Sequence, residues 1–333
     1  MRGNPHSPDP WERFVALERD GVYESNYLKA NSPDGARGLW IKHNLLRPLS
    51  GPALGEFWAV LFARGEAPVV AKREVPLESL ELDPEVLRLR AGPIMLLADR
   101  ATGEISDLRW DLRLTGGLAP VRHLRGPLYR TGFPKKKILT PRPNLRFDGW
   151  VEAAGIRWDV ERWTGLRGHN WGTEHAHTYA YGNCNLWDDG TAGAARTVDG
   201  FSARVKLGAR LSPWLSSLVV RDPDLERNHL LHWLARTEVS HERWSVRWPR
   251  RLGPSVALTL TAPRDSYVGL RYAHPGGAES YCYNTKFADV RLEVGREAWT
   301  SRCGELEVLF PEPLDGVALH PSPDWTQGDY RSD

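Results

Sequence analysis

The sequence predicts an all-β protein made of two tandem antiparallel β-barrels with few short helices. Its 333 residues exceed the usual size of a single hydrophobic core, which favours two domains. Its apolar runs are short and are separated by Pro and Gly turn signals, as strands are. Its 15 tryptophans favour half-buried sheet faces and the walls of apolar pockets.

The expected strands of the first half are short segments rich in Trp, Tyr, Phe and Val. They are residues 23–30, 38–47, 56–63, 69–75, 105–114, 147–151 and 156–163. From Leu108 onward, segment 105–114 alternates apolar and charged residues, which is typical of a half-buried antiparallel strand. The sequence Ala153-Ala154-Gly155 predicts the turn of a hairpin. Helix is expected only at 9–19 and, loosely, at 76–89.

The second half repeats this pattern of short strands. They are residues 178–187, 197–207, 216–221, 242–247, 256–262, 266–272, 280–294 and 304–309. Antiparallel strands with one apolar face can bury that face by closing into a barrel, and about eight strands leave room for one small ligand. Two such barrels fit the chain length, and we expect domains at 1–163 and 164–333.

Composition and motifs exclude several classes of protein. The net charge of +2 is too small to indicate a nucleic-acid partner. The three cysteines include no CxxC pair, so neither a disulfide framework nor a zinc site is expected. Without a signal peptide or a run of about 18 apolar residues, the chain is expected to be cytoplasmic and to have no integral membrane span. The GxSxG motif is missing, which makes a nucleophile-elbow hydrolase unexpected. The nucleotide-binding motifs GxxxxGK[ST] and GxGxxG are also missing, and no cofactor is expected.

Residues 165–189, GLRGHNWGTEHAHTYAYGNCNLWDD, form the densest polar and aromatic cluster in the chain. Gly168 and Gly172 bracket three side chains, which predicts a tight bend, because glycine permits a positive φ or a close backbone approach. The residues that follow alternate, so that every second side chain would share one face of a strand. These are Tyr179, Tyr181, Asn183, Asn185 and Trp187.

A strand face of Tyr, Asn and Trp resembles the wall of a ligand pocket, which is mostly apolar with a few placed polar groups. The alternative is a satisfied hydrogen-bond network that closes the barrel. A metal site is a further alternative, because His175 and His177 share one face and His169 and Glu174 lie near them in the sequence. No metal is assigned. Trp40 and Lys42, at spacing two in the first half, are also candidate pocket residues, although ordinary sheet packing explains them as well.

The motif GLRGHNWG, followed by a strand rich in Tyr and Trp, resembles the bacterial lipocalin-like proteins grouped with hydroxyneurosporene synthase (carotenoid 1,2-hydratase) and tocopherol cyclase. Residues 23–46, YESNYLKANSPDGARGLWIKHNLL, resemble the opening of uncharacterised members of the same group. The resemblance implies two lipocalin-like antiparallel β-barrels side by side, with a ligand cavity between or within them. Known members protonate or cyclise prenyl chains without a redox cofactor, and related fungal proteins steer pericyclic ring closures.

The resemblance therefore implies a cofactor-independent hydratase or cyclase, a lyase or isomerase, that acts on a hydrophobic isoprenoid or polyketide-like molecule. Protonating an alkene needs a desolvated acid and aromatic faces that stabilise the cation. We expect Glu174 to be this acid, with His169 or His175 as its proton partner. The expected substrate-binding residues are Asn170, Trp171, His177, Tyr179, Tyr181, Asn183, Asn185, Trp187, Trp40 and Lys42.

Two other functions compete with this one. The first is a non-catalytic carrier of a hydrophobic small molecule or lipid, which leaves room for transient contact with a membrane. The second is a metal-dependent enzyme that uses His169, His175 and His177. The sequence does not determine the oligomeric state.

Overall fold

A computed structural model describes residues 14, 19–83, 85–190, 196–222, 225–249, 255–322 and 328–332. In these ranges the regular structure is almost entirely antiparallel β-strand. The helical segments there are short 3-10 turns, namely η1 (Leu77–Ser79), η2 (Gly126–Tyr129) and η4 (Arg264–Ser266). No helix within the described ranges is long and apolar enough to cross a membrane.

The first sheet has 13 strands in the order β26-β4-β3-β2-β1-β12-β11-β9-β8-β7-β6-β5, with β10 paired to β11. Its strands are β1 (Val22–Asn31), β2 (Arg37–Arg47), β3 (Leu54–Ala63), β4 (Val69–Pro76), β5 (Glu81–Asp83), β6 (Arg88–Ala91), β7 (Ile94–Leu97), β8 (Arg100–Ile105), β9 (Leu108–Gly116), β10 (Val121–Arg122), β11 (Lys136–Ala153), β12 (Ile156–Gly172) and β26 (Asp329–Arg331).

The second sheet has 11 strands in the order β18-β17-β14-β13-β24-β23-β21-β20-β19, with β22 paired to β23 and β25 parallel to β22. Its strands are β13 (Thr178–Cys184), β14 (Thr197–Arg204), β17 (Leu215–Asp222), β18 (Leu225–His232), β19 (Arg236–Val239), β20 (Arg243–Arg247), β21 (Val256–Thr261), β22 (Val268–Ala273), β23 (Glu279–Val294), β24 (Glu297–Phe310) and β25 (Leu319–His320). A separate hairpin joins β15 (Lys206–Leu207) to β16 (Arg210–Leu211).

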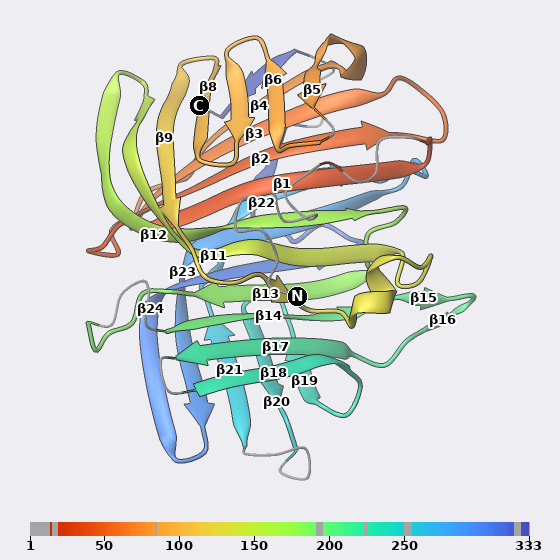
Figure 1. The fold of residues 1–333 in the computed structure, drawn as a ribbon, viewed down its shortest axis with the longest axis vertical. Coiled ribbons are helices and arrows are strands. Elements are labelled where there is room, and N and C mark those ends of the chain that lie inside the picture. The colour runs from red at the N-terminus through yellow and green to blue at the C-terminus, as the bar shows by residue number, and fades with distance from the viewer. Residues whose placement is uncertain are drawn as a thin grey trace, which may run out of the picture.

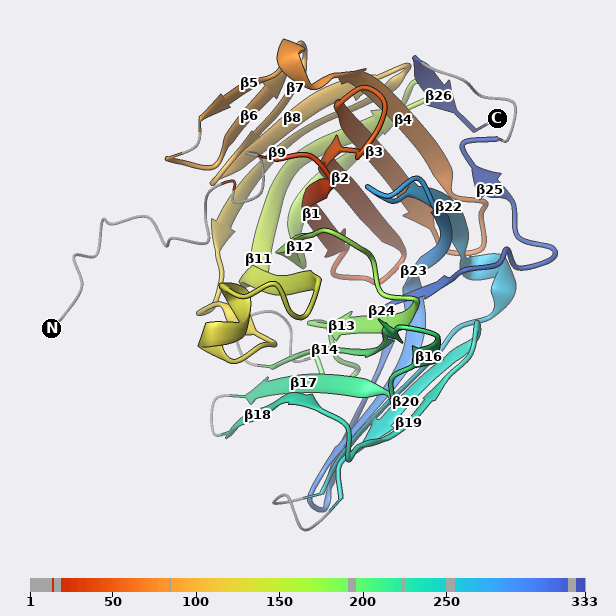
Figure 2. The same ribbon diagram turned by 90° about the vertical axis from the view of Figure 1, so that its right-hand side faces the viewer.

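Each sheet curls strongly on itself, and the two form tandem lipocalin-like antiparallel barrels (Figures 1 and 2). The pairing of β11 with β12 shifts register at three places in β11, within residues 139–142, 142–145 and 147–149. Such bulges bend a strand and increase its twist. The barrels lie side by side, with β11 and β12 of the first next to β13 and β14 of the second (Figure 1). The predicted fold class is confirmed.

Three large apolar clusters follow from this arrangement, beside a small one of Leu124, Tyr129, Leu139 and Trp171. The first fills the curl of the first sheet and includes Leu28 and Phe147. The second fills the curl of the second sheet around Trp244, which is fully buried. The third lies between the sheets and joins Trp58 to Tyr179 and other residues of both barrels. One face of β1 packs into the first barrel and the other faces the layer between the sheets, so β1 is buried along its whole length.

Several local expectations can be compared with the structure. Ala154 and Gly155, with φ of 51° and 74°, form the two-residue turn of the predicted hairpin. Segment 105–114 is not one strand, because Ser106 has a φ of 54° and begins a turn between β8 and β9. Residues 76–89 contain a 3-10 turn and strands in place of a helix, and the expected helix at 9–19 lies almost entirely outside the described residues.

The expected domain boundary at 163/164 falls inside β12, which is one continuous strand of the first sheet. The chain passes to the second sheet between Gly172 and Thr178, and β26 later returns to the edge of the first sheet beside β4.

The predicted bend at 168–172 is wrong, because these residues end β12 and pair with both β1 and β11. The glycines serve close approach. A Cβ on Gly168 would lie 2.1 Å from the Tyr27 ring, and one on Gly172 would lie 2.0 Å from the Lys135 carbonyl oxygen. Only glycine lets Tyr27 lie across β12 at this point.

Candidate functional site

Strand alternation divides the polar residues of β1 and β12 between two places. Tyr23, Ser25 and Tyr27 point into the layer between the sheets, whereas Glu24 and Leu28 point into the first barrel. Neighbouring residues in the sequence therefore serve different environments.

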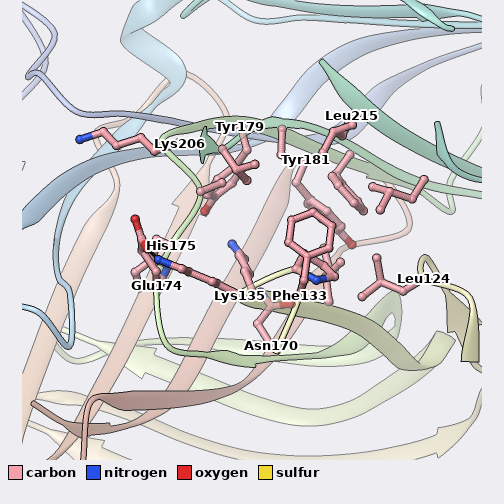
Figure 3. Close-up of a pocket in the computed structure, with 18 of the residues that line it drawn as sticks. Leu124, Phe133, Lys135, Asn170, Glu174, His175, Tyr179, Tyr181, Lys206 and Leu215 are labelled. Atoms are coloured by element: carbon pink, nitrogen blue, oxygen red, sulfur yellow. Dashed lines mark hydrogen bonds and ion pairs between the residues drawn. The ribbon is translucent and has the colours of Figure 1, made fainter. Parts of the chain in front are cut away.

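A cavity of about 240 Å³ opens between the two barrels. It exceeds the roughly 150 Å³ of an apolar cavity that holds benzene, so a small organic molecule fits. Figure 3 shows Tyr179 and Tyr181 across the cavity from Asn170. The lining residues are Tyr27, Leu124, Phe133, Pro134, Lys135, Lys136, Ile138, Asn170, Glu174, His175, Ala176, Tyr179, Tyr181, Phe201, Ala203, Val205, Lys206, Leu207, Leu215, Leu231 and Glu307.

Most of the cavity wall is apolar, and Glu307 of β24 is a buried carboxylate within it. The carboxylate accepts hydrogen bonds from Tyr179 Oη at 2.5 Å, Lys29 Nζ at 3.1 Å and Asn284 Nδ2 at 2.9 Å. Burial alone would raise the pKa of Glu307, but the charge of Lys29 and the Tyr179 hydrogen bond outweigh it and lower the pKa to about 2. Glu307 is therefore ionised at neutral pH.

Lys136, at the start of β11, is half-buried and lines the same cavity. Its ammonium lies 4.0 Å from the centroid of the Tyr179 ring. Burial lowers the pKa of Lys136 to about 8, although the negative charge of Glu307 opposes this shift. Lys136 therefore exchanges a proton near physiological pH.

A smaller chamber of about 20 Å³ lies next to the main cavity. It shares six lining residues with that cavity, namely Tyr27, Lys136, Asn170, His175, Tyr179 and Glu307. Tyr23, Ser25, Trp40, Lys42 and Tyr272 complete its wall. The chamber is the polar end of the site.

The structure places several predicted site residues here. Asn170, Tyr179, Tyr181, Glu174 and His175 line the cavity, as Figure 3 shows. The other two predicted residues that reach the site, Trp40 and Lys42, line the inner chamber.

Glu174 and His175 differ from the acid pair that was expected. The Glu174 side chain is 39% exposed and pairs with Lys135, which is 64% exposed, at 2.5 Å. Glu174 is thus not a desolvated acid. His175 stacks on Tyr23 with ring centroids 4.2 Å apart, and burial lowers its pKa well below the ordinary value, so the imidazole is neutral.

His169 and Trp171 point away from the cavity, because they alternate with Asn170 along β12. His169 Nε2 lies 2.8 Å from Glu24 Oε1, and both side chains are buried in the first barrel. Trp171 stacks against Tyr129 at 5.8 Å. His169 thus lies inside the first barrel, Trp171 belongs to a small apolar cluster that includes Tyr129, and neither residue lines the cavity.

The remaining predicted residues have structural contacts elsewhere. Asn183 donates to the Val198 carbonyl at 2.9 Å, and Asn185 donates to the Gly165 carbonyl at 3.2 Å. Trp187 packs in the apolar cluster of the second barrel. His177 is half-buried outside the cavity wall. The same-face interpretation thus holds for Tyr179 and Tyr181 at the cavity and does not extend to Trp187.

The three histidines of the metal alternative are not brought together. His169 lies in the first barrel, and His175 lies at the cavity. Among the described residues, no group of three His, Cys, Asp or Glu side chains could hold a metal ion.

Sequence reasoning missed Glu307 and Lys136. The run of three consecutive lysines, 135–137, contains no signal that separates the exposed Lys135 from the half-buried Lys136. One signal for Glu307 was present, because Glu305 and Glu307 alternate with Leu306 and Val308 in an expected strand. Two carboxylates at spacing two lie on the same face of a strand, and in a chain whose strands are covered on both sides that face can be an inner one.

A second polar network ties the sheets together beside the cavity. His123 Nε2 lies 3.1 Å from Asp199 Oδ1, and His123 Nδ1 lies 3.0 Å from Ser217 Oγ. Thr140 donates to the other Asp199 oxygen at 2.7 Å. All four residues have no exposed surface, and they come from both sheets. The hydrogen bonds of Ser217 therefore link the two barrels, and Ser217 does not line the cavity.

Comparison with known proteins gives distant relatives. No family model matches the chain. MT0513 from Mycobacterium tuberculosis strain CDC 1551 and Rv0493c from strain H37Rv, both uncharacterised, are each 25% identical to this chain, over 88% of its length and 88% of theirs.

Two solved structures share the fold. CghA, crystallised with Sch210972, superposes with a TM-score of 0.60 at 8% identity, over 91% of this chain and 95% of CghA. NE1406 of Nitrosomonas europaea, an AttH candidate, gives 0.55 at 14% identity, over 86% and 92%. The chain therefore has the two-barrel fold of the lipocalin-like proteins that its sequence resembles.

Proposed function

We propose that this protein is a cofactor-independent hydratase or cyclase that binds a largely apolar small molecule in the cavity between its barrels. The observation that carries the proposal is the composition of that cavity. Its walls are aromatic and aliphatic, and it ends on Lys136, Tyr179 and Glu307, which are close enough to influence one another. A mostly apolar pocket with a few convergent, perturbed ionisable groups is typical of an active site.

Lys136 is the group best suited to move a proton. A general acid or base works best when its pKa lies near the working pH, and burial brings the pKa of Lys136 to about 8. Tyr179 holds its proton more firmly, because burial raises its pKa well above the ordinary value. The ionised Glu307 would stabilise positive charge that develops nearby.

The acid strength of Lys136 favours one of the two expected substrate classes over the other. An isolated prenyl alkene is a very weak base, and an ammonium group is too weak an acid to protonate it efficiently. Carbon next to a carbonyl group exchanges protons far more readily. A polyketide-like enone or other carbonyl compound, hydrated or cyclised through proton transfer, therefore suits the site better than an isoprenoid chain.

Binding can be tested with N-phenyl-1-naphthylamine, a neutral dye whose fluorescence rises in apolar sites. We expect saturable binding by the wild-type protein. Ala203→Trp, which places an indole in the cavity wall, should abolish it. Ala257→Trp, in the second barrel outside this cavity, is the control for general loss of packing. Dye binding that survives Ala203→Trp would contradict the assigned cavity.

Turnover can be tested with a lipophilic extract of the source cells, analysed by mass spectrometry before and after incubation. A hydratase adds the mass of one water to one compound, and a cyclase changes its retention time at constant mass. We expect Lys136→Met to abolish this conversion while dye binding remains. A compound that is retained by the protein but never changed would identify a carrier.

A further inference from the structure

The inner chamber contains several polar atoms without hydrogen-bond partners among the described residues. Tyr23 Oη, Ser25 Oγ and Trp40 Nε1 are three of them, and their side chains are only 1–2% exposed. All three can donate a hydrogen bond. Asn170 Oδ1 and His175 Nδ1, on two other residues of the chamber wall, also have no hydrogen-bond partner among the described residues. Unsatisfied buried donors are rare and costly, and here they converge on one small space.

The charge around the chamber is also unbalanced. The Lys42 ammonium lies 3.8 Å from the centroid of the Tyr272 ring, and no carboxylate of the described residues lies within 4.0 Å of it. Lys136 lacks a carboxylate at that distance as well. Glu307, the carboxylate in the chamber wall, is already bonded to Lys29, Tyr179 and Asn284. Lys42 and Lys136 therefore face the chamber with no carboxylate of the described residues in ion-pair contact, and Glu56 and Glu307 act on Lys42 only from farther away.

Packing alone does not account for this arrangement. A buried lysine without an ion pair is less favourable than methionine of similar volume, because its charge must leave water. A water molecule in about 20 Å³ could accept one or two of the hydrogen bonds, but it would bring no negative charge.

We propose that the inner chamber binds the anionic oxygen of the ligand, a carboxylate or the enolate of a carbonyl group, while the apolar part fills the larger cavity. Lys42, Tyr23, Ser25 and Trp40 would surround that oxygen with donors. This inference rests on the proposed function and adds the chemical class of the head group. It also gives the donors a role, because hydrogen bonds to a developing enolate oxygen would help proton transfer at the adjacent carbon by Lys136.

The test compares two probes of similar shape, the anion 2-naphthoate and the neutral 2-naphthamide, by titration calorimetry. The wild-type protein should bind naphthoate at least tenfold more tightly. Lys42→Met should weaken naphthoate at least tenfold and change naphthamide less than threefold. Arg109→Met removes an exposed charge of the first barrel outside the cavity wall and is the control, so it should change neither probe more than threefold.

Ser25→Ala and Tyr23→Phe are milder variants that remove one donor each and decide the matter if Lys42→Met fails to fold. Each should weaken naphthoate severalfold and leave naphthamide unchanged. Equal affinity of the wild-type protein for both probes, or equal loss of both in the variants, would overturn the inference. If N-phenyl-1-naphthylamine still binds in that case, the head-group assignment alone has failed. If the dye does not bind either, the proposed cavity has failed.

Discussion

Two buried carboxylates show how differently the same chemistry can be used in this molecule. Glu24 meets His169 inside the first barrel, at 2.8 Å, and both side chains are buried and line neither the cavity nor the inner chamber. Glu307 meets three donors between the barrels and also lines the cavity. Burial and hydrogen bonding are common to both. Access to a space that a ligand can enter is what distinguishes Glu307.

Removal of the Glu307 charge is the strongest test of this difference between the two carboxylates. Glu307→Gln leaves Lys29 with less counter-charge in a buried site, and we expect a loss of about 3 kcal/mol in the free energy of unfolding. Urea denaturation measures it. Lys286 lies 3.5 Å from Glu305, so the double variant Lys29→Met/Glu307→Gln keeps one buried cation with one carboxylate and should recover part of the loss. An unchanged unfolding midpoint in Glu307→Gln would mean that the carboxylate is not coupled to Lys29.

The matching change in the first barrel is Glu24→Gln. Because glutamine can still hydrogen-bond to His169, we expect a smaller loss, about 1–2 kcal/mol, in the free energy of unfolding. The affinity for N-phenyl-1-naphthylamine should not change, since Glu24 lies on the opposite face of β1 from the cavity. Weaker dye binding at an unchanged fold would show that the two sites are coupled after all.

The sequence predicts one of these regions better than the other. The fold class follows from short strands and turn signals, and the alternation of Tyr179 and Tyr181 predicts the face that meets the cavity. In 168–172, by contrast, the glycines suggested a bend. Once these residues are known to form a strand, alternation alone assigns His169 and Asn170 to opposite sides.

The charged end of the site could not be assembled from the sequence for a different reason. Lys136 begins β11 and Glu307 lies on β24, and they meet only because β13 pairs with β24 and packs near β11. Such pairing depends on the order of strands in each sheet, which local patterns do not contain. Proximity in the sequence to the aromatic strand favours Glu174, but the long-range contacts place Glu307 beside Tyr179.

The stability of the Lys42→Met variant tests whether Lys42 serves the packing of the fold or the binding of a ligand. Methionine in its place removes an unpaired buried charge and keeps most of the volume, so we expect Lys42→Met to gain about 1 kcal/mol in the free energy of unfolding without ligand. The Tyr272 ring loses a cation–π contact, which reduces the gain. Thermal unfolding monitored by circular dichroism measures the shift. A clear loss of stability would assign Lys42 to the packing of the two barrels.

Lys136 gives the smallest effect and the most specific one, because its two pH dependences have opposite signs. Its folded pKa, about 8, lies below the ordinary 10.5, so between these values the unfolded chain binds more protons and stability rises with pH. Naphthoate stays ionised throughout, while Lys136 loses its charge, so affinity should fall severalfold from pH 7 to pH 9. Lys136→Met should flatten both curves, and naphthamide should be insensitive to pH. If the affinity of wild-type protein for naphthoate stays constant over this range, Lys136 does not contact the anion, and Lys42 alone would have to supply the counter-charge.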